Sequence, residues 1–337
     1  MTLRRALPGV LVLLVLTPAL WAALHRVRME ERAQLWECAT AHTRVGYAGV
    51  SAWRQTEWGH EVRVRHDASS GLTEYRWGET PVVLPSPSSR AADPAAFCLD
   101  PARAARNYRI REVGEGFLLG RRTSLLALEP LHEGRPTVHL TVDAATGLPL
   151  ATATMRWDGA LYRATSFREV AIAPQVVEPP SRPGSLARYG SACPSDKLAD
   201  ELGFQPLRPH YLPAGFEESA SRLLESSGGM ARTTYDDGIT SFEITQRRIL
   251  TPAQNEQALV ARMGERRAEY ILRWIRSERL RALVEAGDAI PGGAVVRRRK
   301  IPAHDSYELQ VGDLNVTLVA RADLHPDEIL RVLQSLR

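Results

Sequence analysis

The sequence has few cysteines and no strong excess of charge. Only three of its 337 residues are cysteine, Cys38, Cys98 and Cys193, and none belongs to a C-x-x-C pair, which argues against a zinc site. One disulfide with a third free thiol is compatible with this count, and the pairing stays open. Lys and Arg total 43 against 39 Asp and Glu, so the net charge of +4 is too small and too evenly spread to indicate a nucleic-acid-binding protein.

The sequence also lacks the short motifs that mark common enzymes. It contains no G-x-S-x-G, no H-E-x-x-H and no Walker loop, and the glycines between Gly114 and Gly120 miss the dinucleotide-binding spacing. His60 and His66 have no third metal ligand nearby, and Cys98 is better explained as a small buried residue than as a nucleophile. The sequence therefore predicts a protein that is not an enzyme and has no metal or cofactor. A hydrolase would need a catalytic arrangement that only spatial proximity could reveal.

One long uncharged run lies near the N-terminus, from Ala6 to Leu24, after Arg4 and Arg5. It predicts an exported protein, with residues 1–30 acting either as a cleaved signal peptide or as a retained anchor that contacts the membrane through residues 6–24. The sequence leaves these two alternatives open. In both, the positive-inside tendency places the rest of the chain outside the cytoplasm.

The stretch from Thr137 to Val170 predicts three successive antiparallel strands. Val138, Leu140 and Val142 alternate with polar residues, so one face of the first strand is apolar and the other is polar. Gly147 and Gly159 lie where the chain must turn between strands. This pattern is typical of a meander in an antiparallel sheet.

Further strands and helices are predicted on both sides of this meander. In the first half, strands are expected in Val45–Arg54, Glu61–Arg65, Leu72–Trp77, Tyr108–Val113 and Phe117–Leu128, with helices in Glu30–Thr43 and from Asp93 towards Ala105, the latter kinked or split at Pro101. Residues 31–174 are predicted to form one domain of about seven or eight strands, residues 175–187 a proline-rich linker, and residues 188–337 a smaller second domain. The second domain is expected to contain hairpins, a long helix from Gln254 to Ala286 and a closing helix after Pro326.

Two sets of motifs carry a family resemblance. The first half contains Gly116-Phe117-Leu118-Leu119-Gly120-Arg121, then the strand from Val138 to Asp143 and the turn Thr146-Gly147-Leu148-Pro149-Leu150. The second half contains Leu212-Pro213-Ala214-Gly215-Phe216 and Tyr235-Asp236-Asp237-Gly238-Ile239-Thr240-Ser241-Phe242. In this order, over about residues 40 to 250, these motifs resemble those of the MucB/RseB family.

The resemblance implies both a fold and a function. It implies the α+β class: an open antiparallel β-barrel like that of the LolA and LppX proteins, wrapped on helices, plus a smaller α+β domain at the C-terminus. It also implies a periplasmic regulatory protein that binds the periplasmic part of a membrane anti-sigma factor and senses an envelope lipid or protein signal. The alternative is a periplasmic carrier that uses the same cavity for a lipid or lipoprotein. A simple carrier does not require the second domain, whereas a regulator needs a second surface.

Two groups of residues are candidates for binding. An apolar barrel interior would suit an acyl chain, and the large side chains that could line it are Tyr47, Trp53, Trp77, Phe117 and Trp157. Ordinary core packing is the competing explanation for each of them. The basic run Arg297-Arg298-Arg299-Lys300 is predicted to be an edge strand that faces either solvent or an acidic partner.

Overall fold

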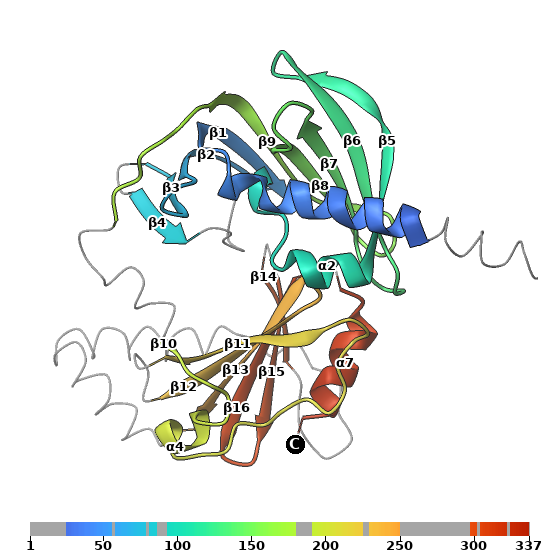
Figure 1. Ribbon diagram of the computed structural model, residues 1–337. Coiled ribbons are helices and arrows are strands. Elements are labelled where there is room, and N and C mark those ends of the chain that lie inside the picture. The colour runs from blue at the N-terminus through green and yellow to red at the C-terminus, as the bar shows by residue number, and fades with distance from the viewer. Residues whose placement is uncertain are drawn as a thin grey trace, which may run out of the picture.

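The computed structural model describes residues 25–55, 58–78, 81–85, 93–179, 191–224, 229–249, 297–301, 304–321 and 324–336. No helix within these ranges combines the length and the apolar character needed to span a membrane. Residues 1–24 of the predicted leader, and the predicted helix from Gln254 to Ala286, lie outside the described residues. The described chain forms two antiparallel sheets (Figure 1).

The first sheet has nine strands in the order β4-β3-β2-β1-β9-β8-β7-β6-β5. Two meanders, β1 to β4 and β5 to β9, are joined by the pairing of β1 with β9. Among the described strands, β4 and β5 end the order without pairing to each other, so the sheet is an open one. The strands are β1 (Tyr47–Gln55), β2 (Trp58–Asp67), β3 (Leu72–Arg76), β4 (Pro81–Pro85), β5 (Tyr108–Leu118), β6 (Arg121–Pro130), β7 (Thr137–Asp143), β8 (Pro149–Met155) and β9 (Leu161–Ile172).

Helical segments lie along one face of the first sheet (Figure 1). They are residues 25–40, η1 (Ala41–Thr43), η2 (Pro94–Ala96) and α2 (Pro101–Asn107). Asp93 caps η2 by accepting the Ala95 N–H at 3.0 Å, and Asp100 caps α2 by accepting the Arg103 N–H at 3.0 Å. Alternation in β7 and helical spacing in residues 25–40 turn apolar side chains towards each other, and the shared core contains Leu35, Cys38, Phe97, Cys98, Ala104, Leu126, Leu128, Val138, Leu140 and Val142.

The second sheet has seven strands in the order β10-β11-β12-β13-β16-β15-β14. The helix α7 (Pro326–Gln334) packs on it through the buried Ile329, Val332 and Leu333, while α4 (Leu198–Leu202) lies near β11 and β12. The strands are β10 (Ser191–Ala192), β11 (Glu217–Leu224), β12 (Met230–Asp236), β13 (Ser241–Arg248), β14 (Arg297–Ile301), β15 (His304–Val311) and β16 (Leu314–Arg321).

The predicted fold class is confirmed, because an open antiparallel sheet with helices on one face is followed by a second unit of strands and helices. The meander from Thr137 to Val170 is found as β7, β8 and β9. The helix expected from Asp93 is divided, with Pro101 beginning a second helix instead of continuing the first. The strand β4 was not predicted, and all three cysteines are free thiols. The predicted domain limits stay a prediction.

One predicted strand boundary is wrong. The sequence indicated a continuous strand from Phe117 to Leu128, whereas β5 ends at Leu118 and β6 begins at Arg121. The two residues between them, Leu119 and Gly120, have φ values of 55° and 74°. Positive φ at both positions is typical of the tight hairpin turn whose twist matches that of the strands. The sequence did not indicate this turn, because the conformation costs a non-glycine residue such as leucine about 1–2 kcal/mol.

Candidate functional site: the junction between the two sheets

The turn between β12 and β13, residues 236–241, packs against the first turn of α2 in the other sheet's domain. The carbonyl of Gly238 accepts the N–H groups of Leu99 at 2.8 Å and Asp100 at 3.3 Å. Gly238 has φ of 97°, and a Cβ atom there would lie 2.2 Å from the backbone nitrogen of Ala104. Only glycine fits this approach, both for its backbone conformation and for the space available.

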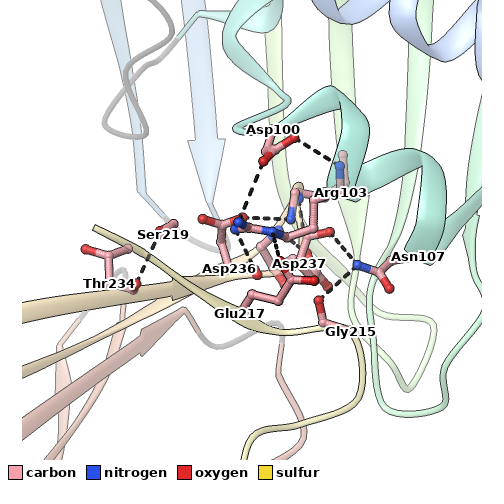
Figure 2. Close-up of polar contacts among 12 residues, drawn as sticks. Asp100, Arg103, Asn107, Gly215, Glu217, Ser219, Thr234, Asp236 and Asp237 are labelled. Carbon is pink, nitrogen blue, oxygen red and sulfur yellow. Dashed lines mark hydrogen bonds and ion pairs between the residues drawn. The ribbon is translucent and has the colours of Figure 1, made fainter. Parts of the chain in front are cut away.

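A charged pair joins the same two elements (Figure 2). The guanidinium Nη1 of Arg103, on α2, lies 2.5 Å from the carboxylate Oδ1 of Asp236, at the end of β12. The two side chains are only 10% and 5% exposed, so the pair is shielded from solvent. Glu217, at the start of β11, adds a second carboxylate 3.4 Å from Nε of Arg103. Buried pairs of this kind are sensitive to geometry, because losing one partner leaves an uncompensated charge.

Asp237 is the most enclosed carboxylate of the junction. Its Oδ1 accepts the N–H groups of Ile239 at 3.0 Å and Thr240 at 2.8 Å, and its Oδ2 accepts the Tyr108 hydroxyl at 3.0 Å. The guanidinium Nε of the buried Arg135 lies 3.7 Å away. Burial raises the pKa of Asp237 above its ordinary value, against the lowering effect of these donors.

The other family motif of the second half, Leu212 to Phe216, contacts the C-terminal end of α2 (Figure 2). The side-chain amide of Asn107 donates to the carbonyls of Gly215 and Asp237, both at 3.0 Å. Gly215 has φ of 83°, and a Cβ atom there would lie 2.3 Å from Oδ1 of Asn107. The turns at Gly215 and Gly238 therefore hold the two ends of one short helix.

The junction is apolar as well as polar. Ile239, next to Gly238, is 4% exposed and belongs to the buried core of the first sheet, in contact with the cluster that includes Phe97 and Val138. The guanidinium of Arg135 lies 4.7 Å from the centre of the Phe216 ring. Since side chains of both units share these contacts, the arrangement fixes how the two sheets are oriented.

The predicted ligand-cavity residues lie in several places. Tyr47 is fully buried and donates its hydroxyl to Asp93 at 2.6 Å, and Trp53 packs on the same core cluster. Trp77 is 48% exposed, Phe117 81% and Trp157 39%. Tyr47 and Trp53 thus belong to one core cluster, whereas the other three side chains are exposed. Whether any of the five touches a ligand stays a prediction.

The predicted basic run forms β14, which is the last strand in the order of the second sheet. It pairs with β15 from Arg297 opposite Glu308 to Ile301 opposite His304. The expected edge position of Arg297, Arg298, Arg299 and Lys300 is therefore found, and their contact with a partner stays a prediction. Within the described ranges, no three His, Cys, Asp or Glu side chains are grouped as metal ligands.

The sequence did not indicate Arg103, Asn107, Arg135, Asp236 or Asp237 as a site. Two consecutive aspartates followed by glycine were interpreted as an ordinary hairpin turn. A hairpin turn does not require two aspartates. The second aspartate was therefore the feature of the sequence that could have indicated a further contact. The motifs that carried the family resemblance in the second half are thus the ones that contact α2.

The two sheets and their junction define the class of protein, which is an α+β protein with two antiparallel sheets. An open antiparallel sheet with helices on one face is joined, through a closely packed junction, to a second antiparallel sheet. Residues 60–184 match the family model of the MucB/RseB N-terminal domain. This part of the chain is therefore similar to the N-terminal domain of the MucB/RseB family, as the resemblance implied.

Individual relatives agree with this assignment. The sigma factor AlgU regulatory protein MucB of Pseudomonas aeruginosa is 28% identical over 148 residues, which cover 43% of this chain and 46% of that protein. The match thus spans about half the length of that relative. The crystal structure of MucB in complex with MucA(peri) aligns over 91% of this chain and 98% of that chain, with a TM-score of 0.56 and 19% identity. A crystal structure of MucB alone aligns over 92% of this chain at 21% identity and the same TM-score of 0.56. These structures share the fold over both sheets.

Proposed function

We propose that this chain is an exported regulatory protein of the periplasm that binds the periplasmic part of a membrane anti-sigma factor. Its relative is named a regulatory protein of a sigma factor, and a solved MucB structure is a complex with MucA(peri). Binding, not catalysis, is the proposed activity. The leader either is cleaved, which frees the protein, or keeps it at the inner membrane.

The observation that carries this proposal is the junction between the two sheets. It joins the family domain to a second unit through hydrogen bonds, a shielded ion pair and a shared core residue. A carrier of lipids or lipoproteins, the alternative function, needs a cavity in one domain and no fixed second surface. A regulator that holds a protein partner across two domains does need their orientation to be fixed.

We further propose that an envelope signal, either a lipid or a protein, releases the partner. A signal can do so only if it binds the released state more tightly than the partner-bound state. The junction is a suitable element for such a change, because any rotation between the sheets must break the contacts of Arg103 and Asp236. Release of the partner and rotation between the two sheets are then expected to occur together.

The test is a crosslinked pull-down of the full-length protein from its native membranes, followed by mass spectrometry of proteins and extracted lipids. Recovery of a single-pass membrane protein with a cytoplasmic sigma-binding segment is the expected result. The Gly238→Ala variant is expected to recover less of it, and Gly159→Ala, at an open turn with φ of 80°, serves as the matched control. Recovery of stoichiometric lipid or acylated lipoprotein without such a partner would favour the carrier and refute the regulator.

A further inference from the structure

A groove of about 450 Å³ crosses β3, β2, β1 and β9 on the first sheet. Its side chains come mainly from positions that alternate with the buried Tyr47, Val62 and Tyr75, so it lies on the face opposite the core of this half of the sheet. The groove includes no residue of the junction and none of the predicted cavity residues. The residues that form the groove are Ala48, Gly49, Val50, Arg63, Val64, Arg65, Glu74, Arg76, Glu169, Val170 and Ala171.

The charges of the groove are arranged in two rows across the strands. In one row Arg63 lies opposite Arg76 on β3 and opposite Val50 on β1. In the other, Arg65 lies opposite Glu74 on β3 and Ala48 on β1. Two arginines directly opposite each other on neighbouring strands repel each other, so this row favours an anion beside them.

The arginines differ in whether they are already paired. Arg76 contacts Glu74 at 3.0 Å. Arg63 and Arg65 are exposed, and in the part of the chain that the structure describes neither has an ion pair or a hydrogen bond. Two guanidinium groups on one face of one strand are thus available to a ligand.

We propose that this groove binds an acidic segment of a polypeptide in extended conformation, with carboxylates at positions i and i+2. Such carboxylates lie about 6.6–6.8 Å apart along a strand, which is also the spacing of Arg63 and Arg65 along β2. A guanidinium group binds a carboxylate through two parallel hydrogen bonds. Charge complementarity therefore selects both the class of ligand and its pattern.

The other groups in the groove favour a peptide over a densely charged ligand. Glu74 and Glu169 lie on either side of the arginines and repel a ligand that carries several negative charges close together. Ala48, Val50 and Ala171 form an apolar area beside Arg63 and Arg65. An acidic peptide with apolar residues near its carboxylates satisfies both conditions. The inference goes beyond the proposed function, because it holds whatever the identity of the protein partner.

The test uses the full chain and a fluorescein-labelled peptide that contains the order Asp-Val-Asp, measured by fluorescence anisotropy. Binding of this peptide is expected. The affinity is expected to fall by about tenfold or more when both Asp of the peptide are replaced by Asn, or when the protein carries Arg63→Gln together with Arg65→Gln. Arg54→Gln, an exposed arginine of β1 outside the groove, is expected to keep the affinity within about twofold. Arg63→Lys keeps the charge without the paired hydrogen bonds, so an intermediate affinity is expected.

Three results would overturn the proposal. They are no binding of the peptide, equal losses for the groove variant and for Arg54→Gln, and binding of phosphatidylglycerol vesicles or inorganic phosphate in place of the peptide. Circular dichroism establishes that each variant is folded. Should the double variant fail to fold, the comparison of Asp-Val-Asp with Asp-Asp-Val on the wild-type chain decides, because only the first order matches alternate positions of a strand.

Discussion

Arg121 and Asp143 join the two sequence motifs of the first sheet through a pair of parallel hydrogen bonds. Nε of Arg121 lies 2.8 Å from Oδ1 of Asp143, and Nη2 lies 3.1 Å from Oδ2. The carboxylate also accepts the Thr146 hydroxyl at 2.6 Å, and its side chain is only 2% exposed. One arginine thus connects the β5–β6 hairpin to the β7–β8 turn.

Replacing Arg121 by Lys is expected to reduce the free energy of unfolding by about 1–3 kcal/mol, because a lysine cannot form the two parallel hydrogen bonds of a guanidinium with the buried carboxylate. Urea denaturation measures the change. Burial opposes ionisation of Asp143, but the hydrogen bonds from Arg121 and Thr146 outweigh it and lower the pKa of Asp143. The stability that the pair contributes is therefore present above the ordinary carboxyl pKa and is lost as the pH falls through the lowered one.

The neighbouring Arg122 supplies the control. Its guanidinium pairs with Glu115 at 2.7 Å, but the two side chains are 65% and 59% exposed. The Arg122→Lys variant is expected to change stability by less than about 0.5 kcal/mol. Equal effects of the two substitutions would show that the buried geometry of Asp143 does not matter.

The Gly238→Ala variant is expected to be strongly destabilised or to unfold in two separate transitions. The added Cβ atom would lie 2.2 Å from the nitrogen of Ala104, so the β12–β13 turn must move away from α2. Calorimetry measures whether the two sheets still unfold together. Gly159→Ala has a similar positive φ but open space, so it isolates the backbone penalty of about 1–2 kcal/mol. A single transition and equal losses for both variants would contradict the role given to the junction.

Patterns local in the sequence predicted most of the first sheet. The alternation of Val138, Leu140 and Val142 predicted β7, because strand side chains alternate between faces. Asp93 was predicted as a helix cap, and its carboxylate does accept the N–H of Ala95. The strand β4 was missed because its terminal prolines, Pro81 and Pro85, argue against a strand, although prolines are tolerated at sheet edges, where β4 lies.

The junction could not be predicted in this way. Arg103 and Asp236 are 133 positions apart, and no periodicity links a residue on a short helix to one at the end of a distant strand. The same limit applies to the groove, since Arg63 faces Arg76 only through the register of β2 with β3. Sequence patterns specify which face of an element is buried, whereas a site depends on which elements meet.

The ion pair between Arg103 and Asp236 is expected to show a coupling energy of about 1–3 kcal/mol in a double-mutant cycle with Arg103→Gln and Asp236→Asn. The reason is that replacing either residue leaves the other shielded from water without its nearest charged partner. The cycle is measured by urea denaturation of the four proteins. Arg248 and Asp313, at 3.3 Å and with side chains 49% and 70% exposed, form the comparison pair, for which the expected coupling is below about 0.5 kcal/mol. Similar coupling for the two pairs would refute a special contribution of the junction.

His42 gives the fold a dependence on acid. Its side chain is buried, and burial lowers the pKa of His42 to about 4, helped by the neighbouring His66 ring and opposed by a contact with the Ala39 carbonyl. In the unfolded chain the pKa of a histidine is about 6.5, so only the unfolded state takes up a proton between these values. The contribution of neutral His42 to the free energy of unfolding is therefore fully present above pH 6.5. It is lost as the pH falls towards 4, by about 3 kcal/mol in total.

The expected measurement is a comparison of urea denaturation at pH 7 and at pH 4.5 for the wild-type chain and the His42→Gln variant. Gln does not titrate, so the variant is expected to lose about 2–3 kcal/mol less over this range than the wild type. His60→Gln, at an exposed position of β2, is expected to follow the wild-type curve. If His42→Gln also follows that curve, the burial of His42 is not the cause of the acid dependence.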